Sequence, residues 1–62
     1  MGRKYEIFVE ILKDTPGALM VTNGDITAWF PKLLIEMDQD GGPGDGVILT
    51  MSESLAIDKG FL

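Results

Sequence analysis

Apolar and polar residues alternate with a period of two near the start of the chain. In an extended segment over residues 4–14, one face would carry Tyr5, Ile7, Val9 and Ile11. The opposite face would be mixed and would carry Glu6, Phe8, Glu10 and Leu12. Because β-branched and aromatic residues are frequent here, a helix is the weaker interpretation. The pattern predicts a long strand, with a bulge or a second, partly covered face at Phe8 and Leu12.

Turn residues divide the next part of the chain into two shorter strands. Residues 15–17 read Thr-Pro-Gly, in which Pro presets φ at the second turn position and Gly accepts a positive φ at the third. Strands are predicted over residues 18–22 and 26–30. Between them stands Asn23-Gly24, the residue pair typical of a type I′ hairpin turn. Pro31 has no N–H, so it must lie at a strand end, an edge or a bulge.

The second half of the chain predicts two more strands and a terminal helix. Alternation over residues 33–38 predicts a fourth strand, and residues 47–51 predict a fifth. Residues 39–46 between them contain four glycines and one proline, so this loop is the best candidate for disorder. Ser52 is a good N-cap and Gly60 suits the C′ position, which predicts a helix over residues 52–59.

Five short strands and one helix predict a mainly β fold. We expect a strongly curved five-stranded sheet or a small barrel of the SH3 or OB type, because closure hides sheet edges. The 62 residues form one domain, residues 1–62. A chain this short has a marginal core and often needs a disulfide, a metal or a second subunit. With no Cys and no His in the sequence, an efficient core or a homodimer remains.

The same absences narrow the chemistry. Without His, the usual proton shuttle at neutral pH and the commonest metal ligand are missing. A serine nucleophile would lack its usual base, and 62 residues leave little volume for a substrate cleft. We therefore expect no enzyme, no cofactor and no metal. No apolar run reaches the ~18 residues of a membrane span, and the N-terminus does not read as a signal peptide, so we expect a cytoplasmic protein.

Stretches spread over most of the chain match a pattern known from a family of small domains. Residues 18–24 read ALMVTNG, residues 28–32 read AWFPK, and residues 52–62 read SESLAIDKGFL. The chain resembles small uncharacterised domains common in phages, prophages and bacteria. Their members read roughly A-[IL]-x-V-x-[DN]-G, then W-[LF]-P-K-S-x-I-E, and finally L-A-x-x-K-G.

The resemblance has departures and limited functional content. Leu33 replaces a Ser that usually follows Pro-Lys, Ser54 replaces an aromatic residue, and Pro16-Gly17 replaces a charged pair. The resemblance implies the fold more than an activity, because the family has no settled activity. Its phage setting implies roles near DNA replication, recombination or defence, which a fold alone does not specify.

Charge indicates the kind of partner. Ten acidic residues against five basic ones give a net charge of −5, which opposes direct binding to phosphate backbones and favours a basic protein surface. Four carboxylates form an acidic tract in the sequence: Glu36, Asp38, Asp40 and Asp45. A calcium loop opening at Asp38 fails because Gly42 stands at the fifth position and Pro43 at the sixth. The tract is then either a mimic of DNA phosphates or a solvated edge.

Trp29, Phe30 and Lys32 form a second candidate, which we call the aromatic segment. It could stack on nucleic-acid bases, or it could contact a protein, because aromatic residues are frequent in interface hot spots. The simpler interpretation is that neighbouring strand residues point to opposite faces, so that one of the two aromatic rings fills the core.

We therefore expect a non-enzymatic, acidic protein-binding module. Its concrete form would be a phage or prophage protein that inhibits or modulates a nucleic-acid-handling host protein, such as an anti-CRISPR or anti-defence DNA mimic. One alternative is an accessory domain that binds single-stranded nucleic acid in phage replication or recombination. Another is a structural homo-oligomer.

Overall fold

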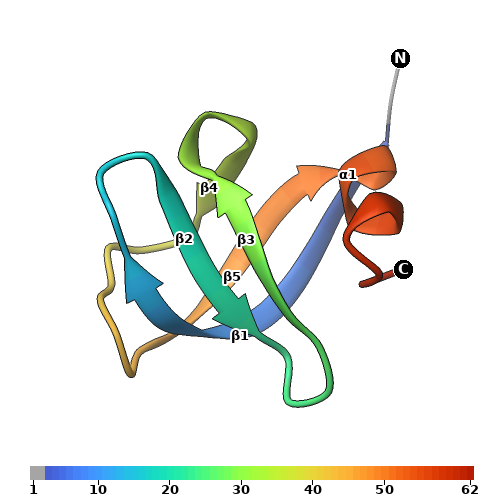
Figure 1. The fold of residues 1–62 in the computed structure, drawn as a ribbon. Coiled ribbons are helices and arrows are strands. Elements are labelled where there is room, and N and C mark those ends of the chain that lie inside the picture. The colour runs from blue at the N-terminus through green and yellow to red at the C-terminus, as the bar shows by residue number, and fades with distance from the viewer. Residues whose placement is uncertain (1–2) are drawn as a thin grey trace.

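The computed structural model describes residues 3–62, which form one antiparallel sheet of five strands with the order β3-β2-β1-β5-β4 (Figure 1). The strands are β1 (Lys4–Asp14), β2 (Ala18–Thr22), β3 (Thr27–Pro31), β4 (Ile35–Met37) and β5 (Gly46–Ser52). A 3-10 turn, η1 (Lys32–Leu34), joins the two edge strands, and the helix α1 (Glu53–Asp58) follows β5. The expected mainly β fold, a curved sheet with a short C-terminal helix, is confirmed.

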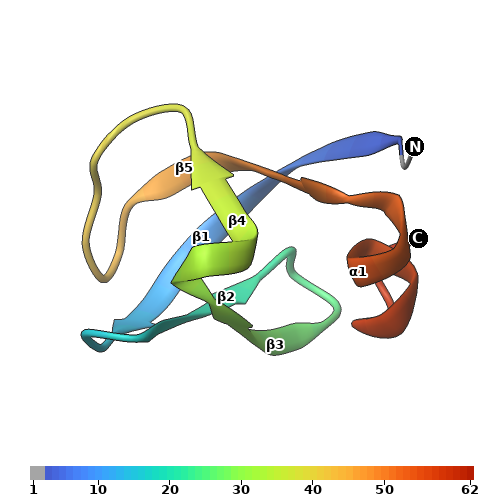
Figure 2. The ribbon, with the colours of Figure 1, turned by 90° about the horizontal axis from the view of Figure 1, so that it is seen from above.

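The long central strand β1 organises the sheet. It pairs with β5 over residues 4–10 and with β2 over residues 10–14. Its register with β2 shifts between Ile11 and Lys13, so the bulge lies at Leu12. A bulge bends a strand and increases its twist. In Figure 2 the sheet wraps round so that β3 and β4, at its two edges, are linked through η1.

The inner face of the sheet carries the core. Its buried residues come from all the strands except β4, and from the C-terminal segment: Val9, Ile11, Leu19, Val21, Phe30, Val47, Leu49, Met51, Ala56 and Phe61. Tyr5 and Ile7 pack partly buried against them. The face of β1 predicted from Tyr5, Ile7, Val9 and Ile11 is therefore the inner one. Glu6, Phe8 and Glu10 lie on the opposite face, which we call the outer face.

The helix α1 and the last residues fill the open end of the curved sheet. The Ser52 hydroxyl accepts a hydrogen bond from the Leu55 N–H (3.2 Å), which is the predicted N-cap. Gly60 has φ +85°, as expected at C′. The Phe61 ring then packs against Phe30, with ring centroids 5.6 Å apart, and the Phe61 carbonyl accepts from the Tyr5 hydroxyl.

Two local predictions are wrong. Residues 33 and 34 belong to η1 and not to a strand, and Leu33 is 98% exposed. The chain turns directly after Pro31, so only residues 35–37 reach β5. Asn23-Gly24 is not a type I′ turn, because only Gly24 has a positive φ. The Asn23 side-chain oxygen accepts from the N–H groups of Asp25 and Ile26, and this side-chain hydrogen bonding favours a longer loop.

The glycine-rich loop, residues 39–46, is tied to β1 by hydrogen bonds. The Ile11 N–H donates to the Asp45 carbonyl (2.9 Å), and the Ile11 carbonyl accepts from the Gly44 N–H (2.8 Å). These bonds continue the pairing of β1 with β5 past Gly46, beside the bulge. The structure thus gives definite backbone partners to the segment that was the best candidate for disorder.

Candidate functional site

Strand register brings distant acidic residues together on the outer face. Glu6 lies opposite Thr50, and Thr50 lies opposite Glu36, so these three side chains form a row across β1, β5 and β4. The next row runs from Phe8 to Ile48, whose backbone is hydrogen-bonded to Asp38. We call this surface the acidic face: Glu6, Phe8, Glu10, Glu36, Asp38, Ile48 and Thr50.

Phe8 lies at the centre of the acidic face and is 67% exposed. Its partner Ile48 is also exposed, so the two form an apolar pair on the side of the sheet away from the core. The Phe8 ring covers Gly46, the residue diagonal to it, and a Cβ at Gly46 would collide with that ring. Gly46 therefore leaves room for the far end of the Phe8 ring over β5, where the ring is accessible to a partner.

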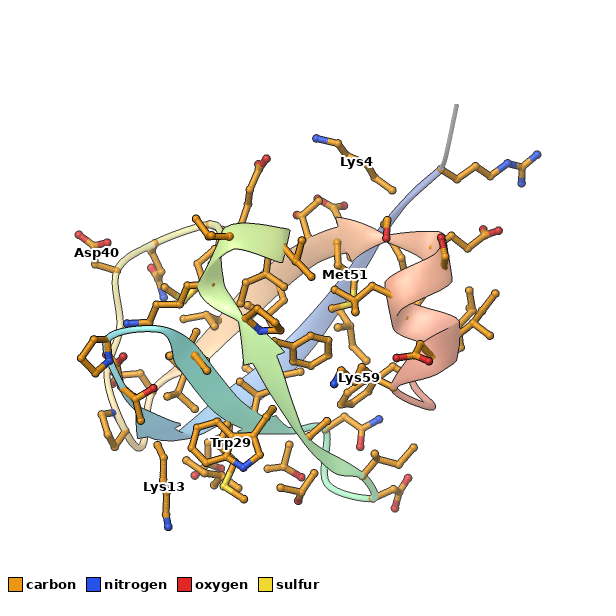
Figure 3. The ribbon with its side chains drawn as sticks, turned by 45° about the horizontal axis from the view of Figure 1, so that its top comes forward. Lys4, Lys13, Trp29, Asp40, Met51 and Lys59 are labelled. Atoms are coloured by element: carbon orange, nitrogen blue, oxygen red, sulfur yellow. The ribbon has the colours of Figure 1, made fainter. Side chains whose placement is uncertain are left out.

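The four carboxylates of the predicted acidic tract have different roles. Asp38 extends the β4–β5 pairing: its Oδ1 accepts from the Ile48 N–H at 3.0 Å. Asp45 closes the loop by accepting from the Gly42 N–H at 2.8 Å. Glu36 is on the acidic face, 3.7 Å from the Lys4 amine, and both side chains are largely exposed. Asp40 is exposed on the loop (Figure 3).

The aromatic segment is divided between the two faces of β3. Phe30 is fully buried in the core, where the Lys59 amine lies 5.9 Å from its ring centroid. Trp29 is 41% exposed on the outer face. The amine of Lys32 forms an ion pair with Asp14. Of the three predicted residues, Trp29 alone is therefore exposed and not engaged in an ion pair, so its indole ring is accessible to a partner. Phe30 packs in the core.

Sequence reasoning missed Glu6, Phe8, Glu10 and Lys13 as surface candidates. The first three were visible as the mixed face of the first strand, but their proximity to Glu36 depends on the β1–β5–β4 register. Lys13 pairs with Met20, and Met20 pairs with Trp29, so a lysine shares the row of the exposed tryptophan. Figure 3 shows Lys13 and Trp29 on the same side of the molecule.

Two shallow hollows lie on the surface of residues 3–62. One, of about 210 Å³, lies between Phe8, Glu10 and the loop at Asn23. The other, of about 130 Å³, lies beside Lys4 and the exposed residues Leu33 and Leu34. Both are smaller than the ~300 Å³ at which typical small-molecule sites begin. Among the residues described, no three acidic side chains are grouped so that they could hold a metal ion.

Comparison with protein-family models, with curated proteins and with solved structures gives no match for this chain. No helix within residues 3–62 is long and apolar enough to cross a membrane.

Proposed function

We propose that the protein is a non-enzymatic binding module whose acidic face engages a basic surface of a nucleic-acid-handling protein and thereby modulates or inhibits it. The observation that carries the proposal is the position of Phe8, 67% exposed among carboxylates that come from β1 and β4, the two strands on either side of β5. Cytoplasmic action and a phage or prophage origin, in an anti-CRISPR or other anti-defence role, belong to the same proposal.

The composition of the acidic face supports a protein partner. Interface hot spots are commonly aromatic side chains surrounded by polar groups that exclude water, and Phe8 with Ile48 supplies such an apolar centre. Glu6, Glu10 and Glu36 are exposed around it, and the Lys4 amine lies 3.7 Å from the Glu36 carboxylate. A basic partner would be steered to this face by charge and retained by burial of Phe8.

The spacing of the carboxylates limits how closely they imitate DNA. Glu6 and Glu10 are four residues apart on one strand, roughly 13 Å, and Glu6 and Glu36 are two strands apart, roughly 10 Å. Phosphates in one DNA strand follow one another every ~3.4 Å along the helix axis. The face therefore matches DNA in the sign of its charge and not in its density, so the apolar centre must supply part of the affinity.

The test removes charge from the acidic face while leaving the backbone hydrogen bonds intact. A variant with Glu6→Gln, Glu10→Gln and Glu36→Gln changes the net charge from −5 to −2. Asp38 and Asp45 are left unchanged because their carboxylates hold backbone N–H groups. The immobilised protein is exposed to the nucleic-acid-binding fraction of a bacterial lysate, and the retained proteins are quantified at increasing salt.

A matched control removes three carboxylates elsewhere: Asp25→Asn, Glu53→Gln and Asp58→Asn, which also gives −2. We expect wild type and control to retain the same protein, and the acidic-face variant to lose at least tenfold of it. Retention by wild type should fall with salt, because exposed charges are screened. Equal retention by the two variants, both folded by circular dichroism, would refute the proposal.

One observation favours the alternative of single-stranded nucleic acid. Lys13, Met20 and Trp29 form a row on the outer face, which places a cation beside an exposed ring on which a base could stack. Titration of Trp29 fluorescence with a single-stranded oligonucleotide at low salt separates the two functions. Quenching by the oligonucleotide, with a binding constant whose logarithm falls linearly with the logarithm of the salt concentration, would favour nucleic acid. The absence of quenching at low salt would remove this alternative.

A further inference from the structure

The edge strand β3 has backbone groups that point away from the sheet. Lys32 donates to the Gly17 carbonyl and Asn23 donates to the Ile26 carbonyl, so these pairs at both ends of the β2–β3 ladder are hydrogen-bonded. Antiparallel pairs alternate between hydrogen-bonded and non-hydrogen-bonded. Counting inward from both ends gives the same answer: residues 27, 29 and 31 direct their backbone groups away from β2.

This alternation explains why Pro31 is tolerated in β3 and which backbone groups of the edge remain unpaired. Pro31 lacks an N–H at a position where the N–H would point away from β2, so the ladder loses nothing. Thr27 and Trp29 retain outward N–H groups, and no loop or helix of residues 3–62 donates to or accepts from them. The free edge therefore has two donors and three carbonyl acceptors in a row of five residues.

An antiparallel copy of β3 complements this row. If the two-fold axis passes between Trp29 of the two copies, their Trp29 residues exchange two N–H···O bonds, since they form a hydrogen-bonded pair. Residue 27 of each copy then faces residue 31 of the other. Each Thr27 N–H donates to a Pro31 carbonyl, so every free donor of the edge finds an acceptor although Pro31 has none to give.

Charge favours a second copy over a charged partner at this edge. The chain carries −5, yet no ionisable residue occurs between Asp25 and Lys32. Edge strands that avoid pairing usually carry charged side chains, above all Lys, and β3 carries none. Glu6 and Glu36 lie on β1 and β4, and β1 is separated from the β3 edge by β2. Two copies can thus approach through the uncharged part of an acidic molecule.

We propose that the protein forms a symmetric homodimer by antiparallel pairing of β3 with β3 of a second copy, centred on Trp29. The two five-stranded sheets become one continuous sheet across the two-fold axis, and the two indole rings stand side by side on its outer face. The second subunit would add stability to a domain of only 62 residues. The acidic face of each copy stays uncovered. The proposal is independent of the proposed function.

The test is sedimentation equilibrium of the full chain across concentrations, together with the emission of Trp29, the single tryptophan. We expect the mass to rise from 6.8 kDa towards twice that value, with a blue shift of the emission over the same concentration range. Higher salt should strengthen the association, because two copies of like charge repel less when screened. Binding of a basic partner at the acidic face should weaken with salt. The opposite salt dependences distinguish a failure of the dimer proposal from a failure of the proposed function.

Two variants that each introduce one lysine on the outer face locate the interface. Trp29→Lys places two like charges opposite each other on the two-fold axis, which opposes pairing. Met20→Lys makes the same change on the outer face in the neighbouring strand β2, one strand away from the axis. With both variants shown to be folded by circular dichroism, we expect dimerisation to weaken at least tenfold in Trp29→Lys and by less than about threefold in Met20→Lys.

Three results would overturn the proposal. The first is a wild-type mass that stays at 6.8 kDa up to millimolar concentration. The second is equal weakening of the dimer in Trp29→Lys and Met20→Lys. The third is a variant with Thr27→Pro that dimerises like wild type, since it lacks the Thr27 donor; Thr27→Val, which keeps the N–H, is its control.

Discussion

The two faces of β1 are one residue apart in sequence and differ in what they do for the molecule. On the inner face, Val9 and Ile11 are almost fully buried in the core. On the outer face, Phe8 is 67% exposed between Glu6 and Glu10. An apolar side chain stabilises a fold by the area that it removes from water, so similar residues contribute unequally on the two faces. The difference indicates that the inner face holds the fold and the outer face is available for binding.

The largest difference in unfolding free energy should appear when a phenylalanine is replaced by alanine on each face in turn. Phe30→Ala removes a fully buried ring that packs on Phe61, and we expect a loss of about 3–5 kcal/mol of unfolding free energy. A domain of this size has roughly 3–9 kcal/mol in total, so this loss is a large share of the stability. Phe8→Ala should cost below about 1 kcal/mol. Urea denaturation followed by circular dichroism measures both, and equal losses would contradict the division of roles.

Asp38 tests whether the outer face is free of structural duties. Its carboxylate accepts from the Ile48 N–H and completes the β4–β5 ladder, so Asp38→Ala should cost about 1 kcal/mol. Asp40→Ala, at an exposed carboxylate on the neighbouring loop, should change the unfolding free energy by less than about 0.5 kcal/mol. Thermal unfolding of the two variants side by side gives the comparison. A harmless Asp38→Ala would mean that the carboxylate is free for a partner.

Gly46 tests the contact beneath the Phe8 ring. Gly46→Ala should cost about 1 kcal/mol or less, because the added Cβ pushes aside a ring that is exposed and free to move. In a Phe8→Ala background the same substitution should be neutral or slightly stabilising. A double-mutant cycle on urea denaturation measures this coupling. Additive effects would show that the ring does not rest on Gly46.

The ion pair between Lys4 and Glu36 should have the smallest effect. Both side chains are largely exposed, with their atoms 3.7 Å apart, so Lys4→Ala should change the unfolding free energy by below about 0.5 kcal/mol. The same variant should increase the affinity of the acidic face for a basic partner, since it frees Glu36. If affinity falls instead, Lys4 itself contacts the partner.

The sequence predicted the elements whose cause is local. Alternation places Val9 and Ile11 on one side of the first strand, and Ser52 with Gly60 defines the short helix, so these positions could be read without a tertiary structure. Which side of the first strand is buried depended on packing. Leu33 was misplaced because an alternating pattern looks the same whether the chain continues straight or turns after Pro31.

The candidate site was less predictable for a related reason. Charge clustering in the sequence favoured Asp38 and Asp45, yet these carboxylates bind backbone N–H groups. Glu6 and Glu36 are thirty residues apart and meet through Thr50, and only the pairing register of three strands shows this. A one-residue slip in register would move a whole set of side chains to the other face.

The most direct test of the account is a paired measurement on the variant with Glu6→Gln, Glu10→Gln and Glu36→Gln. Its unfolding free energy and its retention of the basic partner are measured beside wild type, on the same preparation. We predict an unfolding free energy equal to that of wild type, or slightly higher because like charges are removed. Retention of the basic partner should fall at least tenfold. Full retention by a folded variant would contradict the assignment of binding to the outer face.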